Sequence, residues 1–480
     1  MKRFISAAAC FLALLLLLPS LTVYASGPDI APGCMAVVYN PQSGKFLFSQ
    51  NGGGSTEPTV TAKMVALLLI YAEFRTDMSA EITVTAESIR NVGTAYDTST
   101  PMIGLTAGST FTAQELISCA AVSWANDCIN PLIYALCARQ GIECSDFDEK
   151  MTEYAESLGC KATLYKEPLG RAGRGSKTTA EDVALICSEF YNCYDLLSLS
   201  SAGYYSLRGS TIHNRNYLFS ERIVSGCTLG GMRGMCAGQY ASSGGYCLCS
   251  AYDYGALTYI FVIMNGGILL FDEEGNRYFN PSANPYADIS ALRTWVTAEY
   301  GYVTLCEKGD AVAELTADRA QGTDHLVLSA SETVRVLLES SYSEADITER
   351  INYDLSRITS SRDSSGKTIY TISAPVTKGE TLGMISYLYN GEVIGSSPLV
   401  ASDNLDTDTV LDFFDKAKEM LFSPTALTIF RVLLILAALY VAYCIAAFTV
   451  RVVKKVKKDA AETKKQQKYG GKATSRKKPR

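Results

Sequence analysis

A lysine at the start of an apolar stretch is the first residue that could do chemistry. Lys63 precedes the apolar residues 64–72, which predict a helix with the amine in its first turn. Such a lysine can take a proton from a hydroxyl three residues earlier, because residues i and i+3 share one face of a helix. The residue in that place is Val60, which has no nucleophilic atom. Lys63 is therefore a candidate proton acceptor with no nucleophile in that place.

Two later stretches carry residue types that could bind a peptide. Asn126 and Asp127 follow the apolar residues 116–122, and their side chains could hydrogen-bond to a substrate or to neighbouring backbone. Further on, residues 230–234 read Gly-Gly-Met-Arg-Gly, which we expect to form a short strand.

These stretches resemble the D-alanyl-D-alanine carboxypeptidases, the low-molecular-weight penicillin-binding proteins of peptidase family S11. That family opens its catalytic helix with Pro-Ala-Ser-x-x-Lys, where this chain reads Pro-Thr-Val-Thr-Ala-Lys. Its second motif is Ser-x-Asn. The resemblance implies that Lys63 and Asn126 are retained, while Val60 stands at the nucleophile position and Trp124 at the position of the second-motif serine. We expect Lys63 to persist as an ion-pair partner, with Asn126 as its hydrogen-bond neighbour.

The family's third motif, Gly-x-Lys-Thr-Gly, lies on a strand that receives the substrate carboxylate. By the same resemblance Met232 and Arg233 take the places of lysine and threonine, and Gly234 is retained. An arginine could replace the lost lysine as a carboxylate clamp. Arg233, however, lies one position after the place of that lysine. Because neighbouring residues of a strand point to opposite faces, this favours a solvent-facing side chain for Arg233.

The segments around the motifs predict the fold. Residues 35–48 read as two apolar strands around an Asn-Pro-x-Ser-Gly turn, and Thr112 with Glu115 forms a capping-box pattern. These segments occur in the same order along the chain as in the family. The resemblance implies an α/β serine-peptidase domain of the β-lactamase and penicillin-binding-protein type, with a central antiparallel sheet, over residues 26–300. Short β-type runs then predict a small all-β domain at 301–402, similar to the family's C-terminal domain.

The two ends of the chain predict export and a membrane anchor. Two basic residues, an apolar stretch and a small-residue site indicate a signal peptide at 1–25. Residues 403–424 suit a membrane-proximal amphipathic helix or a packed stalk, and 425–450 form a predicted transmembrane helix. Residues 451–480 carry 13 basic and 2 acidic side chains, which indicates a cytoplasmic tail and an extracellular ectodomain. We expect a single-pass protein of a bacterial cell membrane with a Gram-positive-type envelope.

The composition of the chain limits which classes of partner and cofactor it is expected to bind. Residues 26–421 carry 27 basic and 47 acidic side chains, which argues against nucleic acid or anionic wall polymers as the main partner of the ectodomain. The chain has only two histidines, His213 and His325, and no CxxC pair, so we expect no metal site and no cofactor.

Cysteine usage favours free thiols. The chain has 15 cysteines, and 13 lie in the expected ectodomain, an odd number that cannot all pair within one chain. Many sit in apolar helix-like runs, as Cys119 does, where they read as small buried hydrophobic residues. A disulfide that involves Cys144 and Cys160 stays possible, as does a thiol pair of Cys247 and Cys249.

Three functions remain open. The first is a membrane-anchored pseudoenzyme that binds peptidoglycan stem peptides or regulates an active relative, because a valine at position 60 excludes an acyl-enzyme there. The second is an active serine-type D-Ala-D-Ala carboxypeptidase with a displaced nucleophile, Thr59 or Thr61, each rotated by about 100° around the helix axis. The third is a sensor or scaffold in sporulation or wall synthesis, whose basic cytoplasmic tail contacts a partner such as a cell-wall synthesis protein. The missing nucleophile favours the first.

Overall fold

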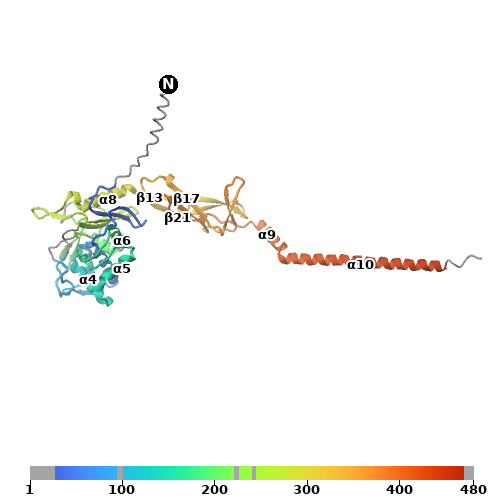
Figure 1. Cartoon of the computed structure of the whole chain (residues 1–480), viewed down its shortest axis with the longest axis horizontal. Coiled ribbons are helices and arrows are strands. Elements are labelled where there is room, and N and C mark those ends of the chain that lie inside the picture. The colour runs from blue at the N-terminus through green and yellow to red at the C-terminus, as the bar shows by residue number, and fades with distance from the viewer. Residues whose placement is uncertain (1–26, 94–100, 221–225, 240–244, 470–480) are drawn as a thin grey trace, which may run out of the picture. The chain divides into compact units, whose positions relative to one another are not determined.

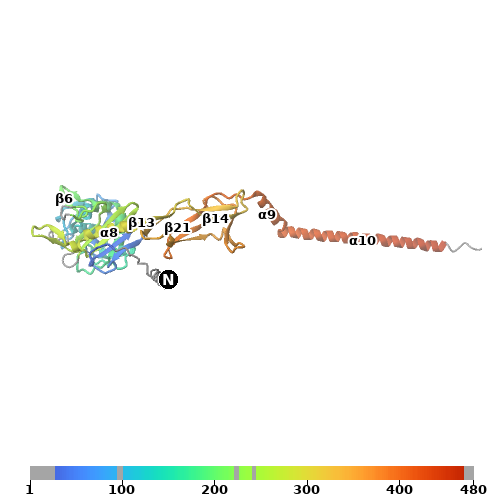
Figure 2. The ribbon, with the colours of Figure 1, turned by 90° about the horizontal axis from the view of Figure 1, so that it is seen from above.

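The computed structural model describes residues 27–93, 101–220, 226–239 and 245–469 (Figures 1 and 2). The predicted signal peptide, 1–25, lies outside the described residues. The chain divides into two compact units. The first runs to Val303 and includes Val336–Tyr342, and the second comprises Thr304–Arg335 and the residues from Ser343 onward.

An antiparallel sheet of six strands forms the centre of the first unit, as predicted. The order across the sheet is β2-β1-β10-β9-β7, and β8 pairs with another part of β9. The hairpin predicted at residues 35–48 is the β1–β2 pair. The strands are β1 Met35–Asn40, β2 Lys45–Gln50, β7 Met232–Arg233, β8 Ala237–Gln239, β9 Tyr246–Tyr254 and β10 Leu257–Met264.

Helices cover both faces of this sheet. Because alternate strand residues point to opposite faces, the facing pair Val37 and Val262 packs with helices α2 to α7, while Val38 and Phe261 pack in a second core with α8. The unit therefore has helices, sheet and helix in three layers. The helices are α2 Ala62–Phe74, α3 Ala113–Ser123, α4 Asn126–Gln140, α5 Phe147–Ser157, α6 Ala180–Asn192, α7 Tyr194–Ser201 and α8 Pro285–Glu299, with the short 3₁₀ turns η1 Thr59–Thr61, η2 Cys144–Asp146 and η3 Pro281–Ala283.

Several two-stranded ladders accompany the main sheet. One of them, β11 with β12, projects side chains toward the site described below. The pairs are β3 Glu81–Thr83 with β4 Thr110–Thr112, β5 Tyr204–Leu207 with β6 Ser210–His213, β11 Leu269–Phe271 with β12 Arg277–Phe279, and β13 Tyr300–Cys306 with β16 Val334–Glu339.

All 14 cysteines among the described residues are free thiols. Cys119 is fully buried in the main core, in agreement with the prediction that such cysteines act as small hydrophobic residues. Cys144 and Cys160 are free as well, so the disulfide left open by the sequence is not formed. Cys247 and Cys249 share one face of β9, yet each remains a free thiol.

The second unit contains a seven-stranded sheet, which confirms the predicted small all-β domain. Its strand order is β17-β20-β21-β15-β14-β19-β18, and the pairs are antiparallel except for the parallel pair of β14 and β19. Inward residues such as Leu315, Leu328 and Ile372 are fully buried. The strands are β14 Ala311–Asp318, β15 His325–Ala330, β17 Ile347–Tyr353, β18 Ile358–Arg362, β19 Thr368–Ser373, β20 Thr381–Tyr389 and β21 Glu392–Ala401, with a 3₁₀ turn η4 at Glu344–Asp346.

Two helices follow the second unit's sheet. α9, Thr409–Leu421, exposes large apolar side chains, among them Phe413 and Phe414. α10, Pro424–Tyr469, is long and apolar enough over Pro424–Lys465 to cross a membrane. The boundaries predicted for the membrane-proximal helix, the transmembrane helix and the tail stay predictions.

One buried carboxylate holds a loop of the first unit in place. Asp127, at the start of α4, accepts hydrogen bonds from the backbone N–H groups of Ile103, Gly104 and Leu105 at 2.7–3.2 Å. Asp127 is fully buried, so water cannot replace it as the acceptor for these groups. The loop that it holds leads into β4 and α3.

Replacement of this carboxylate should weaken the fold. We expect Asp127→Ala to lower the free energy of unfolding by about 3 kcal/mol, because buried N–H groups lose their acceptor. Urea unfolding followed by tryptophan fluorescence measures the change, since both tryptophans lie in the first unit. The control is Asp77→Ala, which removes a partly exposed ion pair with Arg139 and should cost about 0–1 kcal/mol. Equal losses in the two variants would contradict this account of Asp127.

Candidate functional site

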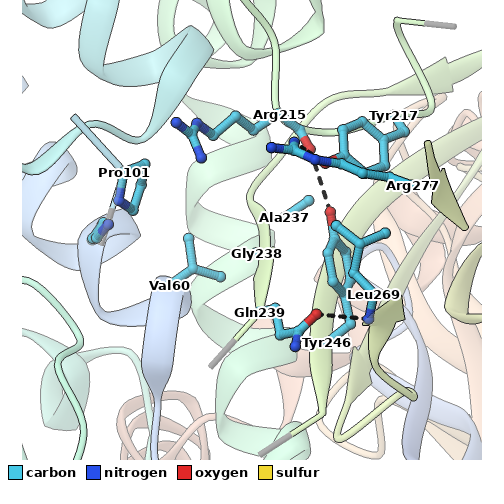
Figure 3. A pocket seen from close by; sticks show the side chains of 11 residues that line it. Val60, Pro101, Arg215, Tyr217, Ala237, Gly238, Gln239, Tyr246, Leu269 and Arg277 are labelled. Atoms are coloured by element: carbon cyan, nitrogen blue, oxygen red, sulfur yellow. Dashed lines mark hydrogen bonds between the residues drawn. The ribbon is translucent and has the colours of Figure 1, made fainter. Parts of the chain in front are cut away.

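A narrow cleft, with about 20 Å³ of free internal space, lies in the first unit beside the start of α2 (Figure 3). It brings together parts of the chain that are far apart in sequence: the helix start, the stretch before α3, the segment after β6, β8, the start of β9, and the β11–β12 pair. The lining residues are Val60, Lys63, Pro101, Arg215, Tyr217, Ala237, Gly238, Gln239, Tyr246, Leu269 and Arg277.

Val60 lines this cleft at the turn that precedes α2. The 3₁₀ turn η1 continues directly into α2, and the Val60 side chain is 8% exposed. Gly238 of β8 lies against it, since a Cβ built on Gly238 would be 3.4 Å from the Cβ of Val60. β8 therefore passes Val60 closely, with only a hydrocarbon side chain between the strand and the helix start.

The hydroxyl groups next to Val60 are all engaged elsewhere. Thr59 donates to the thiol of Cys247 at 3.1 Å, and Thr61 donates to the carbonyl of Pro58. Ser123, near the second motif, donates to a carbonyl of its own helix at 2.6 Å. All three are buried, and none of them belongs to the described residues that line the cleft.

Lys63 is a fully buried amine at the base of the cleft. Its Nζ donates to the carbonyl oxygen of Trp124 at 2.8 Å. Burial, together with the guanidinium of Arg215, lowers the pKa of Lys63 to about 7, although nearby Glu167 and Asp127 act in the opposite direction. Near neutral pH a large fraction of this amine is therefore unprotonated and able to accept a proton.

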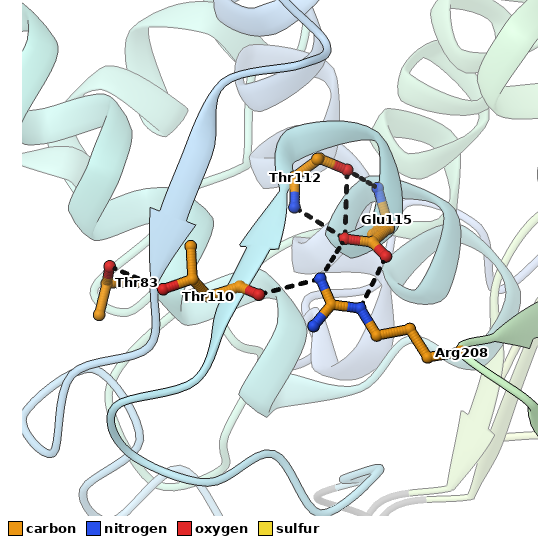
Figure 4. A network of polar contacts seen from close by, with 5 residues as sticks. All are labelled: Thr83, Thr110, Thr112, Glu115 and Arg208. Atoms are coloured by element: carbon orange, nitrogen blue, oxygen red, sulfur yellow. Dashed lines mark hydrogen bonds and ion pairs between the residues drawn. The ribbon is translucent and has the colours of Figure 1, made fainter.

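Helix α3 presents the Trp124 carbonyl to this amine. Figure 4 shows the capping box at its start, as predicted: Thr112 accepts from the N–H of Glu115, and the Glu115 carboxylate accepts from the N–H of Thr112. Arg208 also donates to that carboxylate at 2.9 Å. At the other end Trp124 adopts a left-handed backbone conformation with φ 55°, which ends the helix.

The Trp124 side chain does not line the cleft. Its indole is fully buried in the main core, with its ring centroid 5.9 Å from that of Phe190 on α6. Its Nε1 has no hydrogen-bond partner among the described residues. At the position where the resemblance implies a proton-relaying serine, the chain therefore contributes only a backbone carbonyl to the cleft.

The Asn126 side chain hydrogen-bonds to the backbone and makes no hydrogen bond to Lys63. Its Nδ2 donates to the carbonyl of Val92 at 2.6 Å, and its Oδ1 lacks a partner among the described residues. The expectation that Asn126 is the hydrogen-bond neighbour of Lys63 is therefore wrong in this structure, where the neighbour is the carbonyl of Trp124.

The third predicted stretch does not line the cleft. β7, Met232–Arg233, pairs with the far part of β9, opposite Ala251 and Tyr252. Met232 is buried in the second core, and Arg233 is exposed and pairs with Asp253 at 3.2 Å. The prediction of a solvent-facing arginine is correct, but the assignment of residues 232–234 to the substrate strand is not.

β8 takes that place, four residues further along the chain. The sequence Gly234-Met235-Cys236-Ala237-Gly238 repeats the glycine spacing of the stretch that starts at Gly230, so the spacing alone fits both. The close approach of β8 to Val60 distinguishes them. Gly234 is instead needed for packing, since a Cβ there would be 2.1 Å from the carbonyl oxygen of Ser200.

Two arginines in the cleft were missed from the sequence. Arg215 follows β6, and burial lowers its pKa. Arg277 projects from β12 and donates to the Tyr217 hydroxyl at 3.5 Å (Figure 3). With Lys63 they make three basic side chains, and none of the described lining residues is acidic. The cleft is suited to bind an anionic group such as a carboxylate.

Known proteins share both units of this chain. The family model described as D-alanyl-D-alanine carboxypeptidase matches residues 22–267, and that of the penicillin-binding protein 5 C-terminal domain matches 300–407. The D-alanyl-D-alanine carboxypeptidase DacF of Bacillus subtilis is 22% identical over 384 residues, which cover 79% of this chain and 88% of the relative.

Solved structures share the fold. Penicillin-binding protein 5 from Haemophilus influenzae has a TM-score of 0.54 and 17% identity, with 79% of this chain and 99% of that chain covered. A peptidoglycan synthesis regulatory factor, PBP3, from Streptococcus pneumoniae has a TM-score of 0.54 and 18% identity, with 78% and 98% covered. These structures share the α/β peptidase fold and its C-terminal β-domain.

The buried amine should affect how stability depends on pH. Between about pH 7 and 10.4 the unfolded chain holds a proton on Lys63 that the folded chain releases, so folding becomes more favourable as pH rises through this range. We expect Lys63→Met to remove this part of the rise. Urea unfolding at several pH values in the range measures it, with the exposed Lys45→Met as the control. Parallel pH profiles for Lys63→Met and the native chain would contradict the lowered pKa.

Proposed function

The chain belongs to the D-alanyl-D-alanine carboxypeptidase family, peptidase S11, and from this premise we propose that it binds peptidoglycan stem peptides without forming an acyl-enzyme. It is a carboxypeptidase-like protein of the cell wall. In this proposal the cleft receives the C-terminal end of a stem peptide, and α10 anchors the protein in the membrane.

Val60 is the observation that carries the proposal. Acyl transfer needs an oxygen or sulfur nucleophile in the cleft, next to a group that accepts its proton. The proton acceptor, Lys63, is present with a pKa near 7, but the side chain three residues before it is a hydrocarbon. The neighbouring hydroxyls of Thr59 and Thr61 are buried and donate to other groups, which disfavours the alternative of an active enzyme with a displaced nucleophile.

The lining of the cleft supports peptide binding. Arg215 and Arg277 offer guanidinium groups to a terminal carboxylate. β8 pairs with β9 along one edge, and no described strand pairs with its other edge. An extended peptide could add to that free edge through backbone hydrogen bonds. Cys236, Ala237 and Gly238 would then stand where the family has Lys-Thr-Gly.

The membrane topology forms part of the proposal. The tail at 451–480 is strongly basic, which favours a cytoplasmic location for the tail and an extracellular location for the first unit and the β-sheet of the second. A Gram-positive-type envelope is our expectation for such a protein. Regulation of an active relative or contact with cell-wall synthesis proteins is compatible with stem-peptide binding and needs no further chemistry from the cleft.

A single substitution tests the role of Val60. We expect the native chain to remain unlabelled by a fluorescent penicillin, and Val60→Ser to become labelled slowly, because Lys63 can accept the serine proton. Gel fluorescence and intact mass detect the covalent adduct. Val60→Ala is the matched control, since it removes bulk without adding a hydroxyl, and it should stay unlabelled.

Label on the native chain would refute the proposed lack of acylation and would direct peptide mapping to Thr59, Thr61 and Ser123. An unlabelled Val60→Ser protein would mean that Cys236 and Ala237, in place of lysine and threonine, also prevent acylation.

A second substitution tests the peptide-binding part. We expect Arg277→Gln to weaken binding of a D-Ala-D-Ala-terminated pentapeptide by about tenfold, because a hydrogen bond between charged groups contributes about 1.5–3 kcal/mol. Isothermal titration calorimetry of the detergent-solubilised full chain measures the affinity. Arg233→Gln is the matched control, because this exposed arginine lies outside the cleft. If both variants bind like the native chain, or if an amidated C-terminus binds equally well, the carboxylate does not bind here.

A further inference from the structure

A second hollow, of about 630 Å³, lies wholly within the second unit. Four strands form it: β14, the start of β15 with the residue before it, the end of β17, and the start of β19 with the residue before it. It shares no residue with the cleft of the first unit. The lining residues are Glu314, Leu315, Thr316, Asp324, His325, Tyr353, Lys367, Thr368, Ile369 and Tyr370.

Two tyrosine rings form the aromatic part of this hollow. Tyr353 ends β17 and Tyr370 lies in β19, and their ring centroids are 4.2 Å apart with planes tilted by 41°. β17 is the first strand in the sheet order and β19 is the sixth, so this contact requires the sheet to fold back on itself. Both rings are half-buried, which leaves part of the aromatic surface open to a ligand.

Polar groups of both kinds surround the rings. Glu314 and Thr316 share one face of β14, and Thr316 faces His325 across the β14–β15 pair. His325 hydrogen-bonds to the carboxylate of Asp324 at 3.1 Å. Lys367 adds an ammonium group. The hollow therefore offers carboxylate acceptors, an amine donor and hydroxyls that can do both.

The charge of the β-sheet region of the second unit disfavours polyanions as its ligand. Residues 304–335 and 343–408 together carry 16 acidic and 8 basic side chains. Teichoic acid or nucleic acid would be repelled by such a surface. A neutral ligand with many hydroxyl groups avoids this repulsion and can use donors and acceptors together.

We propose that the hollow beside Tyr353 and Tyr370 binds a neutral oligosaccharide. A sugar ring has an apolar C–H face, which packs on the negative face of an aromatic ring, and a rim of hydroxyls that both donate and accept hydrogen bonds. In the hollow, the tyrosine rings can contact the apolar face of the sugar. Glu314, Asp324 and Lys367 can hydrogen-bond to its hydroxyls. The inference goes beyond the proposed function, because it concerns a separate unit and a different class of ligand.

Calorimetry with a chitin oligosaccharide tests the proposal. The probe is N-acetylated chitotetraose, titrated into the detergent-solubilised full chain. We expect binding to the native chain, and a loss of affinity of about tenfold in Tyr370→Ala, where one ring is removed. Tyr194→Ala, which removes an exposed tyrosine of the first unit, should bind like the native chain.

A second variant, with two substitutions, distinguishes a loss of binding from a loss of folding. Glu314→Gln and Asp324→Asn change exposed carboxylates without removing apolar packing, so the sheet should stay folded, as circular dichroism will check. We expect their combination to weaken chitotetraose binding by about tenfold as well.

The proposal is overturned if the native chain gives no binding at millimolar chitotetraose, or if folded Tyr370→Ala and the double carboxylate variant bind as well as the native chain. It is also overturned if the hollow binds the pentapeptide in place of the sugar. Arg277→Gln should leave chitotetraose affinity unchanged, so failure here and failure of peptide binding in the cleft can be told apart.

Discussion

The burial of most of helix α2 is the constraint on which the first unit depends. Nine of its 13 residues are buried, among them residues on every side of the helix, so protein must cover it all round. Helices α3 to α6 contact it, and the turn at its start contacts β8 and β9. Because Lys63 lies in the first turn, its amine is buried with the rest, and the carbonyl of Trp124 offsets part of the cost of taking it out of water.

If the chain forms no acyl-enzyme, as proposed, this constraint explains how the framework of the site can persist. The position of Val60 depends on packing between the helix start and β8, and a hydrocarbon side chain satisfies that packing at least as well as a hydroxyl would. Trp124 likewise fills the core near Phe190. Side chains without a hydroxyl at these two positions are therefore compatible with the fold, and the basic lining of the cleft depends on other residues, Arg215 and Arg277.

Local patterns in the sequence predicted the elements well, and contacts between distant segments were harder to predict. The spacing of Val60 and Lys63 and the capping box of Thr112 are set within a few residues, so they could be read directly. The strand beside the cleft was misplaced by four residues because Gly234 belongs to two equally spaced glycine pairs. Arg215 and Arg277 meet only through the tertiary fold, and neither has a local signal of its role.

Helix α10 has a mechanical consequence if it anchors the chain as proposed. Its 46 residues form one unbroken helix, about 69 Å long at 1.5 Å per residue, whereas the hydrocarbon core of a bilayer is about 30 Å thick. More than half of its length must then lie outside the hydrocarbon, including a highly charged segment near its C-terminal end. Because no break separates the two parts, a rotation or tilt of the embedded part would rotate or tilt the charged part with it.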